Sequence, residues 1–278
     1  MATLEHDGLR LSYADAGEGP PFVFQHGLGG DATQPASHAP TGRRLVTLEC
    51  RGHGASPLGP EEALGFETFA CDVLGLLDVL GLKRVVLGGI SMGAGVALTL
   101  ARLAPERVRA LVLVRPAWLD RCWPRNLHVF GEIAALLREH EPAAAKVRFI
   151  TRSREYQRIR ILSPMTADSL ISQFDRPCAH ERAAVLERLP ADRPMRPTDD
   201  WEALTMPALV VGARRDPVHP FSCAVALRDR LPSAVLHEVA PKERGEGQHR
   251  RAVAEAIDAF LAGVAPEEPA APVAEARE

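Results

Sequence analysis

The sequence lacks the cysteine patterns that would assign it to a metal-binding or disulfide-rich class. Its five cysteines are odd in number and widely spaced, and no two of them form a C-x-x-C pair. We therefore expect neither a zinc site nor a disulfide framework, and reduced thiols in a cytoplasm are the simplest interpretation. These cysteines are Cys50, Cys71, Cys122, Cys178 and Cys223.

Long apolar runs and a strong charge imbalance are also missing. No stretch approaches the ~20 consecutive apolar residues that a transmembrane helix needs. The first ten residues are mixed polar, so we expect no secretory signal. A formal net charge of -3 is too close to neutral to suggest a nucleic-acid partner. We expect a cytoplasmic protein, without a membrane span, whose partner is a small molecule; the sequence carries no signal for an oligomeric state.

What the sequence does contain is the alternation of an α/β protein. Its 278 residues, 46% of them hydrophobic, suit one large soluble domain with an inserted subdomain. Strand-like apolar runs alternate with segments of helical spacing, which predicts a mainly parallel sheet with helices on both faces. The expected strands are 9–15, 22–24, 44–49, 84–88, 108–114, 208–211 and 234–239, and the expected helices are 66–80, 92–103, 221–231 and 250–261.

One segment, 116–201, breaks this rhythm because it shows helical patterns and no convincing strand. Leu127, Phe130 and Leu137, for example, fall on one helical face. An all-helical insertion between two core strands predicts a cap over the sheet. The tail is rich in Ala, Pro and Glu with no core-forming pattern, so we expect it to be disordered. The predicted organisation is a core of 1–115 and 202–262, a helical cap of 116–201 and a disordered tail of 263–278.

The strongest functional signal is Gly89-Ile-Ser91-Met-Gly93, which lies between an expected strand and an expected helix. In that context a G-x-S-x-G pattern places the serine on a tight, strained turn that projects its hydroxyl above the sheet. The helix that follows offers free N–H groups and a positive dipole end to developing negative charge. We interpret Ser91 as a nucleophile; the alternative is a glycine-rich turn with an incidental serine.

A serine hydroxyl is a poor nucleophile near neutral pH, so it needs a base, and the base needs an orienting acid. In this architecture the acid and then the histidine follow the serine along the chain, just beyond the carboxyl ends of core strands. Asp216 follows the strand at 208–211, and His249 follows the strand at 234–239 through a polar loop. We expect Asp216 to be the acid and His249 to be the base.

Other residues compete for these two roles. His219 lies only three residues after Asp216, which makes it too local to be the obvious base. His237 lies within a strand, where a packing or surface role is expected. Asp199 and Asp200 precede their strand rather than follow it, so they are weaker candidates for the acid.

The oxyanion of acyl transfer needs two further donors. One is the N–H of the residue after the nucleophile, Met92, and the other comes from the loop after an early strand. The segment His26-Gly27-Leu28-Gly29-Gly30 is that loop, and we expect Leu28 to donate. We expect His26 and His53 to be structural. Candidate substrate-binding residues are Arg115, Trp118 and Phe130, although an ion pair at the cap hinge or cap packing explains them equally well.

These motifs in this order resemble the α/β-hydrolase superfamily over about 9–261. The resemblance rests on His26-Gly27, Arg51-Gly-His-Gly54-Ala-Ser56, the G-x-S-x-G pattern, Pro105-Glu-Arg-Val108, Asp216-Pro-Val and His249. The sequence looks most like small bacterial members with a helical cap, such as enol-lactonases, carboxylesterases and carbon–carbon bond hydrolases. The resemblance implies a Ser–Asp–His triad, an oxyanion hole and no cofactor.

The sequence departs from that pattern in three places. Ser91 stands where epoxide hydrolases and haloalkane dehalogenases of this superfamily carry an aspartate, which argues against both activities. Glu49 stands where an aspartate is usual. The stretch after His26-Gly27 is short and contains Pro35 and Pro40, so the helix usual there is expected to be shortened or lost.

The function that we predict is a serine hydrolase that cleaves an ester, lactone or thioester of a small molecule through an acyl-enzyme. Hydrolysis of a carbon–carbon bond in a diketone-like substrate uses the same residues and stays open as an alternative. A non-catalytic, ligand-binding member of the fold is the third possibility, because fold alone does not fix function.

Overall fold

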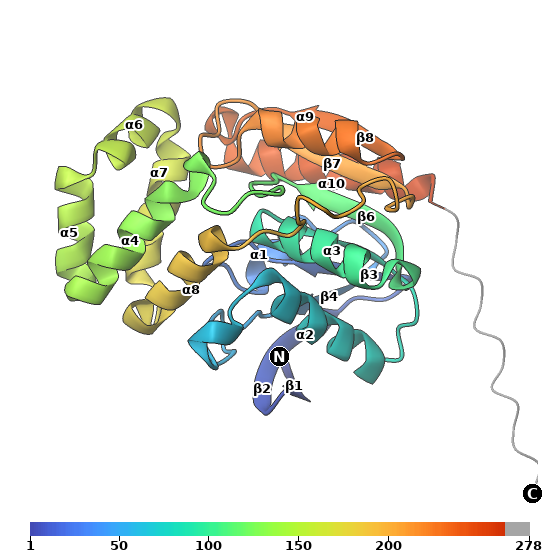
Figure 1. Ribbon diagram of the computed structural model, residues 1–278. Coiled ribbons are helices and arrows are strands. Elements are labelled where there is room, and N and C mark those ends of the chain that lie inside the picture. Colours follow the sequence, from blue (N-terminus) through green and yellow to red (C-terminus); the bar gives the residue numbers. More distant parts are fainter. Residues whose placement is uncertain (265–278) are drawn as a thin grey trace, which may run out of the picture.

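A single eight-stranded sheet organises the chain, of which the computed structural model describes residues 1–264 (Figure 1). The strands lie in the order β1-β2-β4-β3-β5-β6-β7-β8. The pairs β1/β2 and β2/β4 are antiparallel and all the others are parallel, which confirms the predicted fold class. The strands are β1 (Ala2–His6), β2 (Leu9–Ala16), β3 (Pro21–Gln25), β4 (Arg44–Leu48), β5 (Val85–Ile90), β6 (Val108–Val114), β7 (Ala208–Ala213) and β8 (Ala234–Val239).

Helices cover both faces of this sheet. One face packs against α2 (Phe66–Val79), α3 (Met92–Leu103) and α9 (Phe221–Arg230), and the other packs against α10 (Glu246–Ala262). Along β6, Leu111 and Leu113 belong to the first core and Val112 to the second. Because both faces are buried, the central strands are apolar almost throughout.

Five α-helices and two 3₁₀ helices, η3 (Arg125–Leu127) and η4 (Ser172–Asp175), fill the segment between β6 and β7. Every regular element described there is helical. They gather to one side of the sheet, in green and yellow in Figure 1. Phe149 packs its ring against those of Tyr156 and Phe174 and so joins three of the cap elements. The helices are α4 (His128–Glu139), α5 (Pro142–Arg152), α6 (Arg154–Leu162), α7 (Pro164–Ile171) and α8 (Ala179–Ala191).

Three segments differ from, or refine, the sequence-based expectation. Strand β1 was not anticipated. The helix after β3, α1 (Thr33–Ala36), has only 4 residues, as the prolines of that stretch suggested. A short 3₁₀ helix, η5 (Lys242–Arg244), and then α10 from Glu246 occupy the segment expected to be a polar loop. The tail predicted to be disordered lies outside the described residues from position 265 onward. Within 1–264, no helix has the length and apolarity to cross a bilayer.

A buried arginine ties the end of β4 to its surroundings. The Arg51 side chain is 1% exposed and that of Asp72 on α2 is 0% exposed. Arg51 donates from Nε and Nη2 to the two Asp72 carboxylate oxygens at 2.8 Å each, and Nη2 also donates to Asp7 in the β1–β2 turn at 2.9 Å. One guanidinium therefore links the sheet edge, a helix and a turn.

We predict that Arg51→Met destabilises the protein by about 3–5 kcal/mol, because it leaves the buried Asp72 carboxylate without its cation. Urea unfolding at neutral pH measures this. Arg44→Met is the matched control: Arg44 makes the same two-point contact with Asp15, but on the surface, and its loss is expected to cost at most about 1 kcal/mol. Equal losses for the two variants would contradict the prediction.

Candidate active site

Ser91 occupies a strained turn between β5 and α3. Its φ of 57° and ψ of -107° are unusual for a non-glycine residue, and its N–H donates to the Val114 carbonyl at 2.9 Å. A Cβ on Gly89 would lie 2.3 Å from the Gly93 carbonyl carbon, and a Cβ on Gly93 would lie 2.4 Å from the Gln25 oxygen. Both glycines of the motif are therefore required for the backbone to close this turn.

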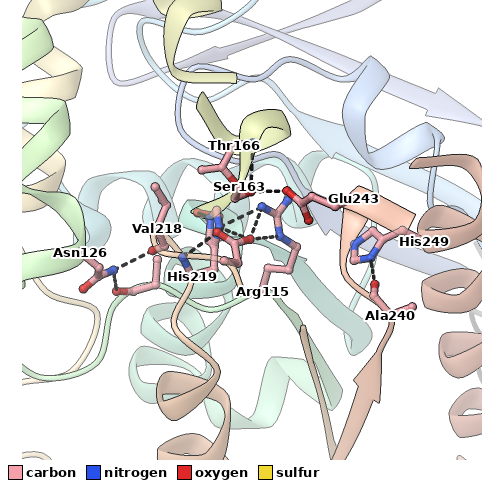
Figure 2. Close-up of polar contacts among 12 residues, drawn as sticks. Arg115, Asn126, Ser163, Thr166, Val218, His219, Ala240, Glu243 and His249 are labelled. Atoms are coloured by element: carbon pink, nitrogen blue, oxygen red, sulfur yellow. Dashed lines mark hydrogen bonds and ion pairs between the residues drawn. The ribbon is translucent and has the colours of Figure 1, made fainter. Parts of the chain in front are cut away.

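His219 and Asp216 lie in hydrogen-bonded series with Ser91. The His219 Nε2 atom is 2.8 Å from the Ser91 hydroxyl oxygen, and its Nδ1 atom is 3.0 Å from Asp216 Oδ2. Arg115, which directly follows β6, donates to the same Asp216 oxygen from Nε at 3.0 Å and from Nη2 at 2.5 Å. Figure 2 shows the His219 ring and the Arg115 guanidinium side by side. A hydroxyl, an imidazole and a carboxylate are thus aligned for proton transfer.

The hydrogen on His219 is assigned to Nδ1. This nitrogen lies 3.0 Å both from Asp216 Oδ2 and from Arg115 Nη2. A lone pair on Nδ1 would face the Asp216 carboxylate and be repelled, whereas an N–H on Nδ1 donates a hydrogen bond to that carboxylate. The Arg115 guanidinium already donates two hydrogen bonds to Asp216, so it does not need Nδ1 as an acceptor. Nε2 then carries the lone pair and accepts the Ser91 hydroxyl, which is the tautomer that a general base requires.

A compact turn brings the acid and the base together. Asp216 Oδ1 accepts the His219 backbone N–H at 3.1 Å, so the carboxylate closes its own four-residue turn. The Asn126 amide, just ahead of the first cap helix, donates to the Val218 carbonyl at 2.8 Å and to the Ala117 carbonyl at 3.1 Å. The turn is therefore held by the Asp216 carboxylate within it. It is also held by Asn126, whose bond to Val218 is drawn in Figure 2.

The expectation that His249 would contact Ser91 is corrected by this arrangement. His249 lies in the first turn of α10 and its Nδ1 bonds to the Ala240 carbonyl at 2.7 Å. Its Nε2 is buried without a hydrogen-bond partner among the described residues. The segment expected to be a polar loop is instead folded into η5 and the start of α10, and this holds His249 against the end of β8 (Figure 2).

The two predicted oxyanion donors lie on either side of Ser91. Met92 is the first residue of α3, so its N–H has no partner carbonyl within the helix. Leu28 lines the same cavity as Ser91, and the loop that carries it is fixed by Gln34, whose Oε1 accepts the Gly27 N–H at 2.6 Å. Donation by Leu28 and Met92 stays a prediction that this arrangement permits.

Of the three predicted substrate-binding residues, one faces the cavity freely. Phe130 lines the cavity with Ser91. Arg115 also lines it, but its guanidinium is committed to Asp216, so the ion-pair interpretation describes it better than a substrate clamp. Trp118 is corrected: it is 1% exposed, stacks edge-on against Phe66 and donates its indole N–H to the Leu189 carbonyl.

Two cavities meet at the turn that carries the acid and the base. The inner one, about 60 Å³, is lined by Ser91, His219, Lys242 and residues of the cap. The outer one, about 670 Å³, lies between Asp216-Pro217, the start of the cap and the exposed Ile161 and Leu162 of α6.

Burial and Arg115 set the protonation of the candidate triad. Burial alone would raise the pKa of the Asp216 carboxyl, but the Arg115 and His219 charges outweigh it and hold that pKa well below the usual value. Burial lowers the pKa of His219 to about 4, with Arg115 adding to the effect and Asp216 opposing it. His219 is therefore neutral, and able to accept a proton, over the physiological pH range.

The neighbouring histidines of the first loops are structural. His26 Nε2 accepts the Cys50 N–H at 3.1 Å, so Nδ1 donates to the Gly27 carbonyl at 2.9 Å. His53 Nδ1 donates to the Arg51 carbonyl at 3.0 Å. Glu49, the residue in place of the usual aspartate, accepts from the Ala32 and Ala55 N–H groups and so joins two loops beside the site.

Comparison with known proteins identifies the family of the chain. The family model for the alpha/beta hydrolase fold matches residues 20–243. The chain belongs to the α/β-hydrolase family. It is 27% identical over 241 residues to a 2-hydroxymuconate semialdehyde hydrolase from a Pseudomonas strain, covering 83% of this chain and 82% of that protein.

Solved structures of this family share the fold. An enol-lactonase from Burkholderia xenovorans superposes with a TM-score of 0.73 at 22% identity, covering 94% of this chain and 100% of that one. A thermophilic esterase from Thermogutta terrifontis superposes with a TM-score of 0.72 at 25% identity, covering 94% and 97%. A 2-hydroxymuconate semialdehyde hydrolase and an esterase are thus among the proteins to which this α/β hydrolase is similar, and an enol-lactonase shares its fold.

Sequence reasoning set His219 aside as too local to Asp216, and it did not single out Lys242; both line the cavity with Ser91. The signal for His219 was the spacing Asp216-Pro-Val-His219, because side chains three residues apart in a tight turn face the same side. Lys242 stood in a charged run that resembled a solvated loop, and no local signal distinguishes it from its neighbours there.

We predict that the His219 imidazole titrates near pH 4 in ring-nitrogen NMR, far below the ordinary 6.5. Arg115→Gln removes a neighbouring positive charge that disfavours imidazolium, so the midpoint is expected to rise toward 6.5. Arg44→Gln, which breaks a similar ion pair at the opposite ends of the strands, is expected to leave the midpoint unchanged. A wild-type midpoint at or above 6.5 would contradict the assigned environment.

Proposed function

We propose that this α/β hydrolase is a serine hydrolase that cleaves an ester, lactone or thioester of a small molecule through an acyl-enzyme. The observation that carries the proposal is the unbroken series from the Ser91 hydroxyl through His219 to the Asp216 carboxylate. The strained turn at Ser91 and the free helix end at Met92 support it, because acyl transfer needs a projecting nucleophile beside a donor for the oxyanion.

The mechanism follows from the assigned tautomer. Ser91 attacks the acyl carbonyl while His219 Nε2 takes its proton, and Asp216 stabilises the imidazolium that forms. The Leu28 and Met92 N–H groups bind the oxyanion, where one such donor is worth about 3–4 kcal/mol of barrier. His219 then protonates the leaving group, and in the second half-reaction it deprotonates the water that releases the acid.

Carbon–carbon bond hydrolysis is the second candidate. The similarity to the 2-hydroxymuconate semialdehyde hydrolase over most of both chains favours it. The same Ser91, His219 and oxyanion donors would serve that reaction, with a carbon leaving group taking the proton. Product analysis by mass spectrometry with ester, lactone and diketone substrates separates the two reactions.

We predict that Ser91→Ala and His219→Gln each lower kcat/KM for short p-nitrophenyl esters by about 10⁴-fold or more. His249→Gln is the matched control: it is the same substitution at the other candidate histidine, and the glutamine amide can still donate to the Ala240 carbonyl. We expect it to cost less than about 10-fold, because His249 does not touch the reacting atoms.

The outcomes separate the claims. Loss of activity in His249→Gln but not in His219→Gln would overturn the assignment of the base and leave the serine hydrolase intact. Full activity of Ser91→Ala would overturn the proposed function. No turnover, together with no labelling of Ser91 by a fluorophosphonate, would favour a non-catalytic binding protein.

A further inference from the structure

The inner cavity is lined by two cations and no carboxylate. Arg115 and Lys242 both line it, together with Ser91, His219 and the amides Gln34 and Gln173. Arg115 is neutralised by its two-point contact with Asp216. Lys242 is not neutralised in this way, because no hydrogen bond or ion pair of its ammonium is found within residues 1–264. The cavity that holds the nucleophile therefore carries one uncompensated positive charge.

The acidic side chains close to Lys242 are already engaged. Asp216 accepts from Arg115 and from His219 on both of its oxygens. Glu243 accepts the hydroxyl of Ser163, which caps helix α7. Glu246 pairs with Arg250 one helical turn later.

A half-buried ammonium without a counter-ion raises the free energy of the folded protein, and an anion that enters the cavity and pairs with it lowers that free energy. The geometry points to an anionic acyl substrate: we propose that Lys242 binds a carboxylate on the acyl part of the substrate, beside the bond that Ser91 attacks. This rests on the proposed function for its catalytic meaning, although the carboxylate site itself does not require turnover. The small inner volume, about 60 Å³, suits a short acyl chain ending in a carboxylate.

The position of Lys242 fits this role. It is the first residue of η5, directly after Pro241, so the end of β8 and the 3₁₀ turn hold its backbone on the core rather than on the cap. Ser163 of the cap bonds to the next residue, Glu243, and Thr166 of the cap lines the same cavity (Figure 2). An anion at Lys242 would therefore lie where the cap and the core meet.

The direct test compares acyl groups that differ only in charge. We measure kcat/KM for the p-nitrophenyl monoesters of glutaric and adipic acid against p-nitrophenyl pentanoate and hexanoate, after subtracting spontaneous hydrolysis. The wild type is expected to prefer the anionic esters by about 10- to 100-fold, the range for a hydrogen bond between charged groups. Lys242→Met is expected to bring this ratio close to one, and Lys242→Arg to restore part of it.

Lys83→Met serves as the control, because Lys83 is exposed at the start of β5 and its loss is expected to leave the ratio unchanged. Circular dichroism and thermal unfolding verify that each variant is folded. Absence of an anion preference in the wild type, or its persistence in folded Lys242→Met, would overturn the inference. Neutral esters that are cleaved in a Ser91-dependent way without any such preference would overturn it while leaving the proposed function standing.

A binding measurement keeps the inference testable if no ester is turned over. Calorimetry of glutarate with Ser91→Ala is compared with calorimetry of the double variant Ser91→Ala/Lys242→Met. Binding that weakens at least about 10-fold without the ammonium supports the carboxylate site even where the proposed reaction fails. No binding in the presence of Lys242, together with no anion preference, would overturn it.

The pH dependence supplies an independent readout. Burial, and then the Arg115 charge, lower the pKa of Lys242 to about 8. The protonated form binds the anion, so the wild-type ratio of anionic to neutral kcat/KM is expected to fall as the pH rises through about 8, and Lys242→Met is expected to show no such fall. Among the other groups that face Lys242, Arg115 and Arg250 are cations. The lowered pKa values of Asp216 and Glu246 keep these carboxylates ionised through this range. The lowered pKa values of His38, His219 and His249 keep these histidines neutral through it.

Discussion

The Asp216 carboxylate is the group on which the rest of the site depends. One of its oxygens accepts the backbone N–H of His219 and so forms the turn, and the other accepts the His219 ring and the Arg115 guanidinium. The same anion therefore shapes the loop, selects the imidazole tautomer and neutralises the cation at the end of β6. Because these contacts share one buried group, none of them can be removed without changing the others.

Because Arg115 and His219 share the Asp216 carboxylate, that carboxylate stabilises the protonated form of His219 less than it otherwise would. In a triad whose acid serves only the histidine, the carboxylate favours imidazolium. Here burial is the main cause of the lowered His219 pKa, and the Arg115 charge lowers it further, against the opposing effect of Asp216. A weaker base is always deprotonated at neutral pH but has less driving force for taking the Ser91 proton. In the mechanism proposed above, stabilisation of the oxyanion at the Leu28 and Met92 N–H groups would therefore have to supply a larger part of the rate.

Much of the fold could be predicted because its signals are local and periodic. The G-x-S-x-G turn was predictable because only glycine tolerates the approach of Gly89 to Gly93, and the buried strands are apolar on both faces. The base could not be assigned in the same way. Asp216 and His219 meet through one turn of backbone, whereas His249 was displaced by a charged run that folded into η5 and α10. Burial of Trp118 against Phe66 and Leu189 likewise depends on tertiary packing that no local spacing encodes.

Placing the acid and the base on one turn changes what the segment after β8 has to do. If His219 supplies the base, the segment from Pro241 to His249 does not have to supply a catalytic histidine. His249 can then have a structural role, in which its buried ring bonds to the Ala240 carbonyl. That segment still borders the nucleophile, because its position at the carboxyl end of β8 is fixed by the sheet. The side chain it contributes to the inner cavity is the Lys242 ammonium. Under the two proposals above, the Lys242 ammonium selects the substrate by charge, because Arg115 is already neutralised by Asp216. The proposed chemistry and the proposed recognition then come from two different loops of the same sheet edge.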